Sequence, residues 1–71
     1  MKLDAGQKNL LRLCREEADA EGWAKMSEVV YLHFVKMIPA ELVEIERIEG
    51  DGGRVRLTED GKQVLFAMAF L

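Results

Sequence analysis

The chain has 71 residues, which is enough for one domain and not for a second. Its 13 acidic residues outnumber its 10 basic residues, and the formal net charge of −3 argues against a strong non-specific grip on nucleic acid. Cys14 is the only cysteine, so an internal disulfide is excluded, and the lack of a secretory leader or of an apolar run of about 20 residues predicts a cytoplasmic protein.

The first predicted element is a helix over residues 4–20. Asp4 and Gln7 have the spacing of a capping box, in which each side chain accepts a hydrogen bond from the other residue's backbone N–H. Apolar residues, Cys14 among them, then recur at steps of three and four and give the helix a core face. The Cys14 thiol is either a small buried hydrophobe or a reactive group, and the second role would need a neighbouring His or Lys.

A short connection follows over residues 21–26. Trp23 is the largest apolar side chain in it and is expected to cover the edge of the core. Residues 23–26 could also add a short third strand beside a later hairpin.

Residues 27–38 fit a helix and a strand by different criteria. Their β-branched and aromatic side chains favour a strand. A serine N-cap and an apolar stripe through Phe34 and Ile38 favour a helix, which is the prediction made here. Pro39 ends this helix, and residues 39–41 form either a turn or the first turn of a short extra helix.

Residues 42–58 are predicted to form a β-hairpin, because apolar and charged side chains alternate in two arms joined by a glycine-rich tip. The side chains expected on the buried face are those of Val43, Ile45, Val55 and Leu57. A tip of three or five residues places Ile45 opposite Leu57 and Glu46 opposite Arg56. The same register places Arg47 opposite Val55.

The last predicted element is a helix that Thr58 caps and that two acidic residues favour at its positive end. Gly61 in the first turn is expected to cost a little stability. Nearly every residue from Val64 onward is apolar, and Phe66 and Phe70 form a stripe beside the main one. This surplus either covers the hairpin or forms a partner surface.

The stretch of residues 42–62 resembles the wing of winged helix-turn-helix proteins. In that family a strand of the type Leu-Val-Glu leads into the wing, and Leu-Thr-x-x-Gly-Lys leads out of it into a helix. Residues 42–44 and 57–62 carry these patterns, while the first half of the chain matches only in the order of its elements.

The resemblance implies a single α+β domain over residues 1–71, in the order helix, short strand, helix, β-hairpin, helix. It also implies DNA binding, usually in transcription regulation, with a recognition helix before the wing. Here either residues 39–44 form a short recognition helix, or that helix is missing.

On this resemblance the residues that could contact DNA are Lys25, His33, Lys36, Arg47, Arg54 and Arg56. Arg54, nearest the tip, could bind phosphates or be neutralised across the sheet by a glutamate, and both alternatives stay open. For Arg56 neutralisation across the sheet is favoured. Any affinity for duplex DNA would be modest and strongly salt-dependent.

We therefore expect a small non-enzymatic module associated with DNA and transcription regulation. The alternative is a protein–protein interaction domain of the same fold, binding a second copy or another protein through a surface that includes Tyr31, Phe66 and Phe70. No acid, base or nucleophile can be brought together, and the lone His33 cannot build a zinc site, so no catalytic residue, metal or cofactor is expected.

Overall fold

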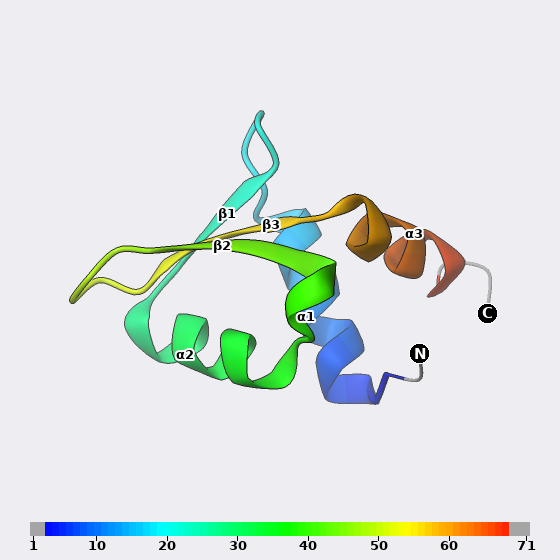
Figure 1. Cartoon of the computed structure of the whole chain (residues 1–71), viewed down its shortest axis with the longest axis horizontal. Coiled ribbons are helices and arrows are strands. Elements are labelled where there is room, and N and C mark those ends of the chain that lie inside the picture. Colours follow the sequence, from blue (N-terminus) through cyan, green and yellow to red (C-terminus); the bar gives the residue numbers. More distant parts are fainter. Residues whose placement is uncertain (1–2, 69–71) are drawn as a thin grey trace.

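The computed structural model describes residues 3–68, and its elements follow the predicted order (Figure 1). They are α1 (Ala5–Glu16), β1 (Trp23–Met26), α2 (Glu28–Met37), the 3-10 turn η1 (Ala40–Leu42), β2 (Val43–Arg47), β3 (Gly53–Leu57) and α3 (Glu59–Met68). The three strands form one antiparallel sheet in the order β1-β3-β2. The predicted α+β class and order of elements are confirmed, including the short strand β1.

The capping box at the start of α1 is confirmed. The N–H of Gln7 donates to Asp4 Oδ1 at 2.8 Å, and the N–H of Asp4 donates to Gln7 Oε1 at 2.9 Å. The helix ends at Glu16, four residues earlier than predicted. Asp19 accounts for the early end, because its N–H donates to the Trp23 carbonyl while its carboxylate accepts the Trp23 N–H, which closes a tight loop before β1.

The predicted register of the hairpin is wrong by two residues. Ile45 lies opposite Val55 and not opposite Leu57. The tip is a five-residue loop, residues 48–52, that ends at Gly52 with a φ of +75°. Since a shift of two residues keeps every side chain on its own face, Val43, Ile45, Val55 and Leu57 share the inner face as predicted. The predicted burial of Ile45 is wrong, because β2 is an edge strand of the sheet and this side chain is 52% exposed.

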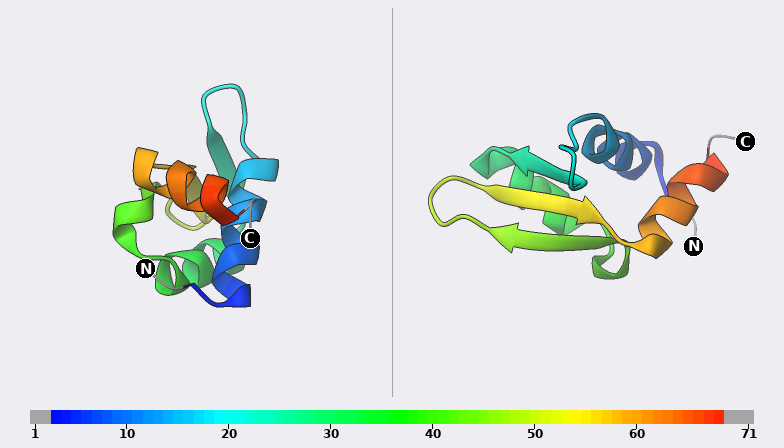
Figure 2. Two further views of the ribbon diagram at one scale, coloured as in Figure 1. Left: turned by 90° about the vertical axis from the view of Figure 1, so that its right-hand side faces the viewer. Right: turned by 90° about the horizontal axis from the view of Figure 1, so that it is seen from above.

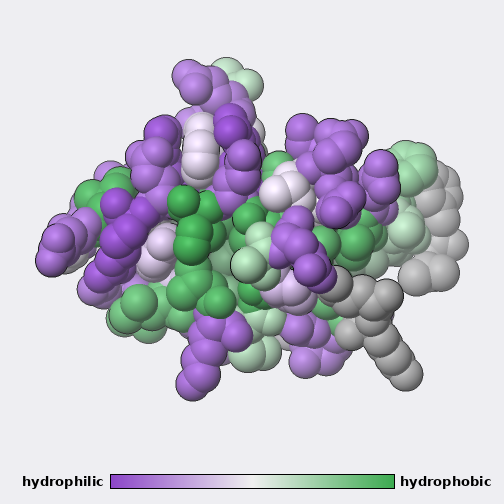
Figure 3. Space-filling model, in the orientation of Figure 1, coloured by the Kyte–Doolittle hydropathy of each residue, from purple (hydrophilic) through white to green (hydrophobic). Residues whose placement is uncertain are grey.

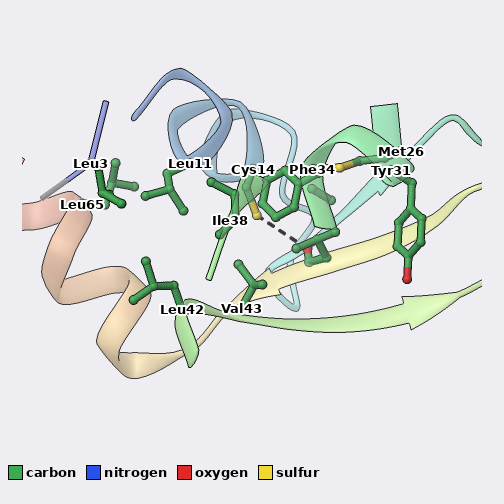
Figure 4. Close-up of a cluster of buried hydrophobic side chains, with 12 residues drawn as sticks. Leu3, Leu11, Cys14, Met26, Tyr31, Phe34, Ile38, Leu42, Val43 and Leu65 are labelled. Carbon is green, nitrogen blue, oxygen red and sulfur yellow. Dashed lines mark hydrogen bonds between the residues drawn. The ribbon is translucent and has the colours of Figure 1, made fainter. Parts of the chain in front are cut away.

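The inner face of the sheet packs on α1 and α2 and forms the core (Figure 2). The largest side chains in full burial are Phe34, Leu11, Leu42, Val55 and Cys14. Figure 4 shows Phe34 of α2 and Cys14 of α1 side by side between the helices and the sheet. Both helices therefore reach the same central strand, β3.

The last helix, α3, packs closely on η1 at Gly61. The Thr58 hydroxyl caps α3 by accepting the Gly61 N–H at 3.1 Å, while the Thr58 N–H donates to the Leu42 carbonyl at 3.0 Å. A Cβ on Gly61 would lie 2.1 Å from that same carbonyl oxygen. Within residues 3–68 no helix is long and apolar enough to cross a membrane.

Candidate functional site

The outer face of the sheet carries the two arginines of β3, each bonded to a glutamate of β2. Arg54 Nε donates to Glu46 Oε1 at 2.9 Å, and Arg56 Nε donates to Glu44 Oε2 at 2.6 Å. The bonded residues are directly opposite in the sheet, whereas the predicted register paired Glu46 with Arg56. The glutamates thus occupy part of the donor fork that an arginine would offer to a phosphate.

Trp23 of β1 packs against both of these arginines. The Cζ atoms of Arg54 and Arg56 lie 4.3 Å and 4.4 Å from the centre of its ring, within range of a cation–π attraction. The hydrogen bonds that Arg54 donates to Glu46 raise the pKa of Arg54 above its already high ordinary value. Each arginine side chain is 37% exposed, so both are partly shielded from solvent.

Arg47 holds the hairpin tip against the start of α2. Its Nη2 donates to Glu28 Oε2 at 2.9 Å, and its Nη1 donates to the Gly52 carbonyl at 3.0 Å. Glu28 also accepts the Gly52 N–H at 2.9 Å. The bond to Arg47 and then the bond to Gly52 lower the pKa of the Glu28 carboxyl. The Arg47 guanidinium therefore has a structural role at the tip.

Of the remaining DNA-contact candidates, Lys25 lies directly opposite Arg54 in the sheet, whereas His33 and Lys36 lie elsewhere. Lys25 lies on the outer face of β1, 3.9 Å from Asp51 at the tip. His33 and Lys36 are exposed on α2, which packs against the opposite face of the sheet. Between α2 and the hairpin the chain forms only the three-residue turn η1, so no recognition α-helix precedes β2. The six candidates are thus divided between two sides of the molecule.

The helix α2 exposes different side chains from those predicted. Tyr31, expected at a partner surface, is only 4% exposed, and a Cβ on the facing Gly53 would lie 2.6 Å from its ring. The expected exposure of Tyr31 is therefore wrong. Val29 and Leu32 are exposed instead, by 77% and 50%.

These two side chains belong to an apolar surface that spans two elements. Ile45 of β2 is 52% exposed, and it lines a hollow of about 100 Å³ together with Val35 of α2. Val29, Leu32 and Val35 follow one another at steps of three along the helix. Figure 3 shows hydrophobic surface over β2 and α2. We call Val29, Leu32, Val35 and Ile45 the α2–β2 apolar surface.

A second hollow lies between α1, β3 and α3. It has a volume of about 380 Å³, and its walls include Cys14, Leu65 and Phe66. Phe66 is 68% exposed, as a contact with a partner would require. Phe70, predicted for the same partner surface, lies outside the described residues.

The Cys14 side chain at this hollow is a buried thiol and not a reactive one. It is 1% exposed, and its Sγ donates to the Val55 carbonyl at 3.7 Å. Burial raises the pKa of the thiol to about 11, so the nucleophilic thiolate is scarce at neutral pH. Across the described part of the chain, no three His, Cys, Asp or Glu side chains are grouped to hold a metal ion.

No protein-family model, curated protein or solved structure matches this chain. Its function therefore has to be inferred from its own residues and their geometry.

Proposed function

We propose that this domain is a non-enzymatic protein-binding module of the cytoplasm, and that it meets its partner at the α2–β2 apolar surface. The observation that carries the proposal is the exposure of Val29, Leu32 and Ile45 on two neighbouring elements. Complete burial of an exposed aliphatic side chain contributes about 1.5–3 kcal/mol, and burying the exposed half of Leu32 or Ile45 contributes about half of that. Apolar residues gathered on one face of a small domain are typical of a protein interface.

DNA binding, which the winged-helix resemblance predicts, is the second candidate. The observation that favours it is the hairpin, with Arg54 and Arg56 on its outer face. Both arginines are hydrogen-bonded to glutamates, and Arg47 is bonded to Glu28. A phosphate would first have to displace these bonds, which is why we rank this function below protein binding.

A peptide-display library tests the proposed function. The library is selected on the wild-type domain and depleted on a Leu32→Ser, Ile45→Thr double variant, which should remove the apolar surface while leaving the core intact. Peptides that bind the wild type at least tenfold more tightly than the double variant are expected. A Phe66→Ser variant is the matched control, because it removes an exposed apolar side chain from α3 and should not affect these peptides.

If no peptide distinguishes the wild type from the double variant, the α2–β2 apolar surface is not a binding site and the proposal fails. Titration with random-sequence duplex DNA at low salt examines the second candidate. Binding at protein concentrations on the order of tens of micromolar, weakened by salt, would support DNA association instead.

A further inference from the structure

Within residues 3–68, the outer edge of β2 has backbone groups without a partner strand. In the sheet order β1-β3-β2, strand β2 is paired on one side only (Figure 2). The Leu42 carbonyl accepts the Thr58 N–H, and the Ile48 N–H donates to the Gly52 carbonyl. The backbone groups of Leu42 and Ile48 thus face the β3 side of the hairpin. Because hydrogen-bonded and non-bonded pairs alternate in an antiparallel ladder, Glu44 and Glu46 also face β3 with their backbone groups.

The alternate residues of β2 therefore point their backbone groups away from β3, toward the open edge of the sheet. The N–H and C=O of Ile45 and Arg47 face the open edge, together with the C=O of Val43, whose N–H donates to Ala40 in η1. A row of groups of this kind is the template to which an extended peptide adds as a further strand.

The side chains at this edge differ sharply between the two faces of the sheet. On the inner face Ile45 belongs to the α2–β2 apolar surface, which continues onto α2 at Val35. On the outer face Glu44 and Glu46 are each about half exposed, and they are bonded to Arg56 and Arg54 of β3. A strand added beyond β2 would lie nearer to these carboxylates than to the two arginines, because β2 would separate it from β3. Residues 41–49 contain four exposed glutamates, and their one cation, Arg47, is bonded to Glu28.

We propose that β2 accepts an extended segment of a partner protein whose side chains alternate between basic and apolar. Its basic side chains would lie beside Glu44 and Glu46, and its apolar ones would cover the α2–β2 apolar surface. This inference rests on the proposed function and names the partner's chemistry. A second copy of the chain fits poorly, because antiparallel pairing of two β2 strands sets glutamates against glutamates in every register that pairs more than one residue of each β2 and keeps Ile45 on the inner face.

A fluorescent, acetylated seven-residue peptide of alternating lysine and valine is the probe. Its binding to the wild-type domain, followed by anisotropy at low salt, should be at least tenfold tighter than that of a peptide of the same composition with its valines in one block. It should also be tighter than an alternating glutamate and valine peptide by a similar factor. If the peptide with its valines in one block binds equally well, charge alone explains the binding and the proposal is overturned.

Methylation of the peptide backbone then tests strand addition itself. Alternate N–H groups of an added strand point toward β2, so of two peptides methylated on alternate amides, one should lose binding at least tenfold and the other should keep it. Ile45→Thr should weaken the unmethylated peptide, and Phe66→Ser should not. If both methylated peptides bind equally well, no strand is added.

These outcomes separate the two proposals. If display selection yields peptides that need Leu32 and Ile45 but have no basic–apolar alternation, the surface binds proteins and the strand mode is refuted. Sedimentation of the domain alone gives a further test. If the domain is a dimer and Ile45→Thr makes it a monomer, the surface binds a second copy of the chain, and the proposed partner segment is refuted.

Discussion

Gly61 offers the sharpest test of the packing between α3 and η1. In an exposed helix, replacing glycine by alanine stabilises a protein by about 1 kcal/mol, because alanine restricts the unfolded chain and favours the helix. Here the added Cβ would lie 2.1 Å from the Leu42 carbonyl oxygen and 3.1 Å from its carbon. That carbonyl cannot easily yield, because it accepts the Thr58 N–H at 3.0 Å in the connection to α3.

The steric cost should therefore exceed the gain in helix propensity. Forcing an extra carbon into a packed contact costs about 1–3 kcal/mol, and more when the neighbour is backbone. A contact of 2.1 Å with a backbone oxygen places the steric cost at the upper end, about 2–4 kcal/mol, so after the gain of about 1 kcal/mol we expect Gly61→Ala to destabilise the domain by roughly 1–3 kcal/mol. With an unfolding slope of about 1 kcal/mol per molar urea for a small protein, the urea midpoint should fall by roughly 1–3 M.

Urea titration followed by Trp23 fluorescence, the signal of the only tryptophan, measures this shift. Gly6→Ala is the matched control, because Gly6 is exposed in α1 and its added Cβ would meet only Asp4 Oδ1 at 3.4 Å. The control should leave the midpoint unchanged or raise it. A Gly61→Ala protein as stable as the wild type would refute the close packing of α3 on η1.

Three further predictions concern the core, the thiol and the hairpin tip. Phe34→Ala removes a side chain with no exposed surface at a cost of about 3–5 kcal/mol. The free energy of unfolding expected for a chain of this length is about 4–11 kcal/mol. The Phe34→Ala variant should therefore lose most of its helical circular dichroism at moderate urea, whereas Val29→Ala should behave as wild type. Because its pKa is about 11, Cys14 should react with a thiol reagent near pH 8 about a hundredfold more slowly than an ordinary cysteine, and at the full rate in concentrated urea. The Glu28 carboxyl has a lowered pKa in the folded state, so its stabilising bonds are fully present above its ordinary pKa of 4.5 and are lost as the pH falls through the folded value. The urea midpoint of the wild type should therefore drop more steeply below pH 4.5 than that of Glu28→Gln.

The order and type of the elements could be predicted because local signals agree with one another. Asp4 with Gln7 marks the start of α1, Pro39 follows the end of α2, and alternation marks both arms of the hairpin. The register could not be predicted to the residue, because alternation decides only which face a side chain takes. The choice between registers depends on the tip, where Glu28 and Arg47 hold Gly52 across a long stretch of sequence.

The exposed apolar surface could not be predicted for a related reason. Residues of α2 are apolar on most sides, so periodicity does not decide which of them face inward. Contact with the sheet decides it, since Gly53 leaves room for the Tyr31 ring and thereby turns Val29 and Leu32 outward. The need for glycine at position 61 could not be predicted either, because it comes from the nearby Leu42 carbonyl and not from the helix that contains Gly61.

The charges of the hairpin bear on which partner the domain can attract. Arg47, Arg54 and Arg56 would make a basic hairpin if they were free, yet each is hydrogen-bonded to a glutamate. Such pairs remove cations and anions in equal number, so the net charge of −3 is carried by the rest of the surface. A phosphate backbone would meet that excess of negative charge, whereas a basic strand at the β2 edge would be attracted by it. The same ion pairs that stabilise the hairpin thus favour a basic protein partner over DNA.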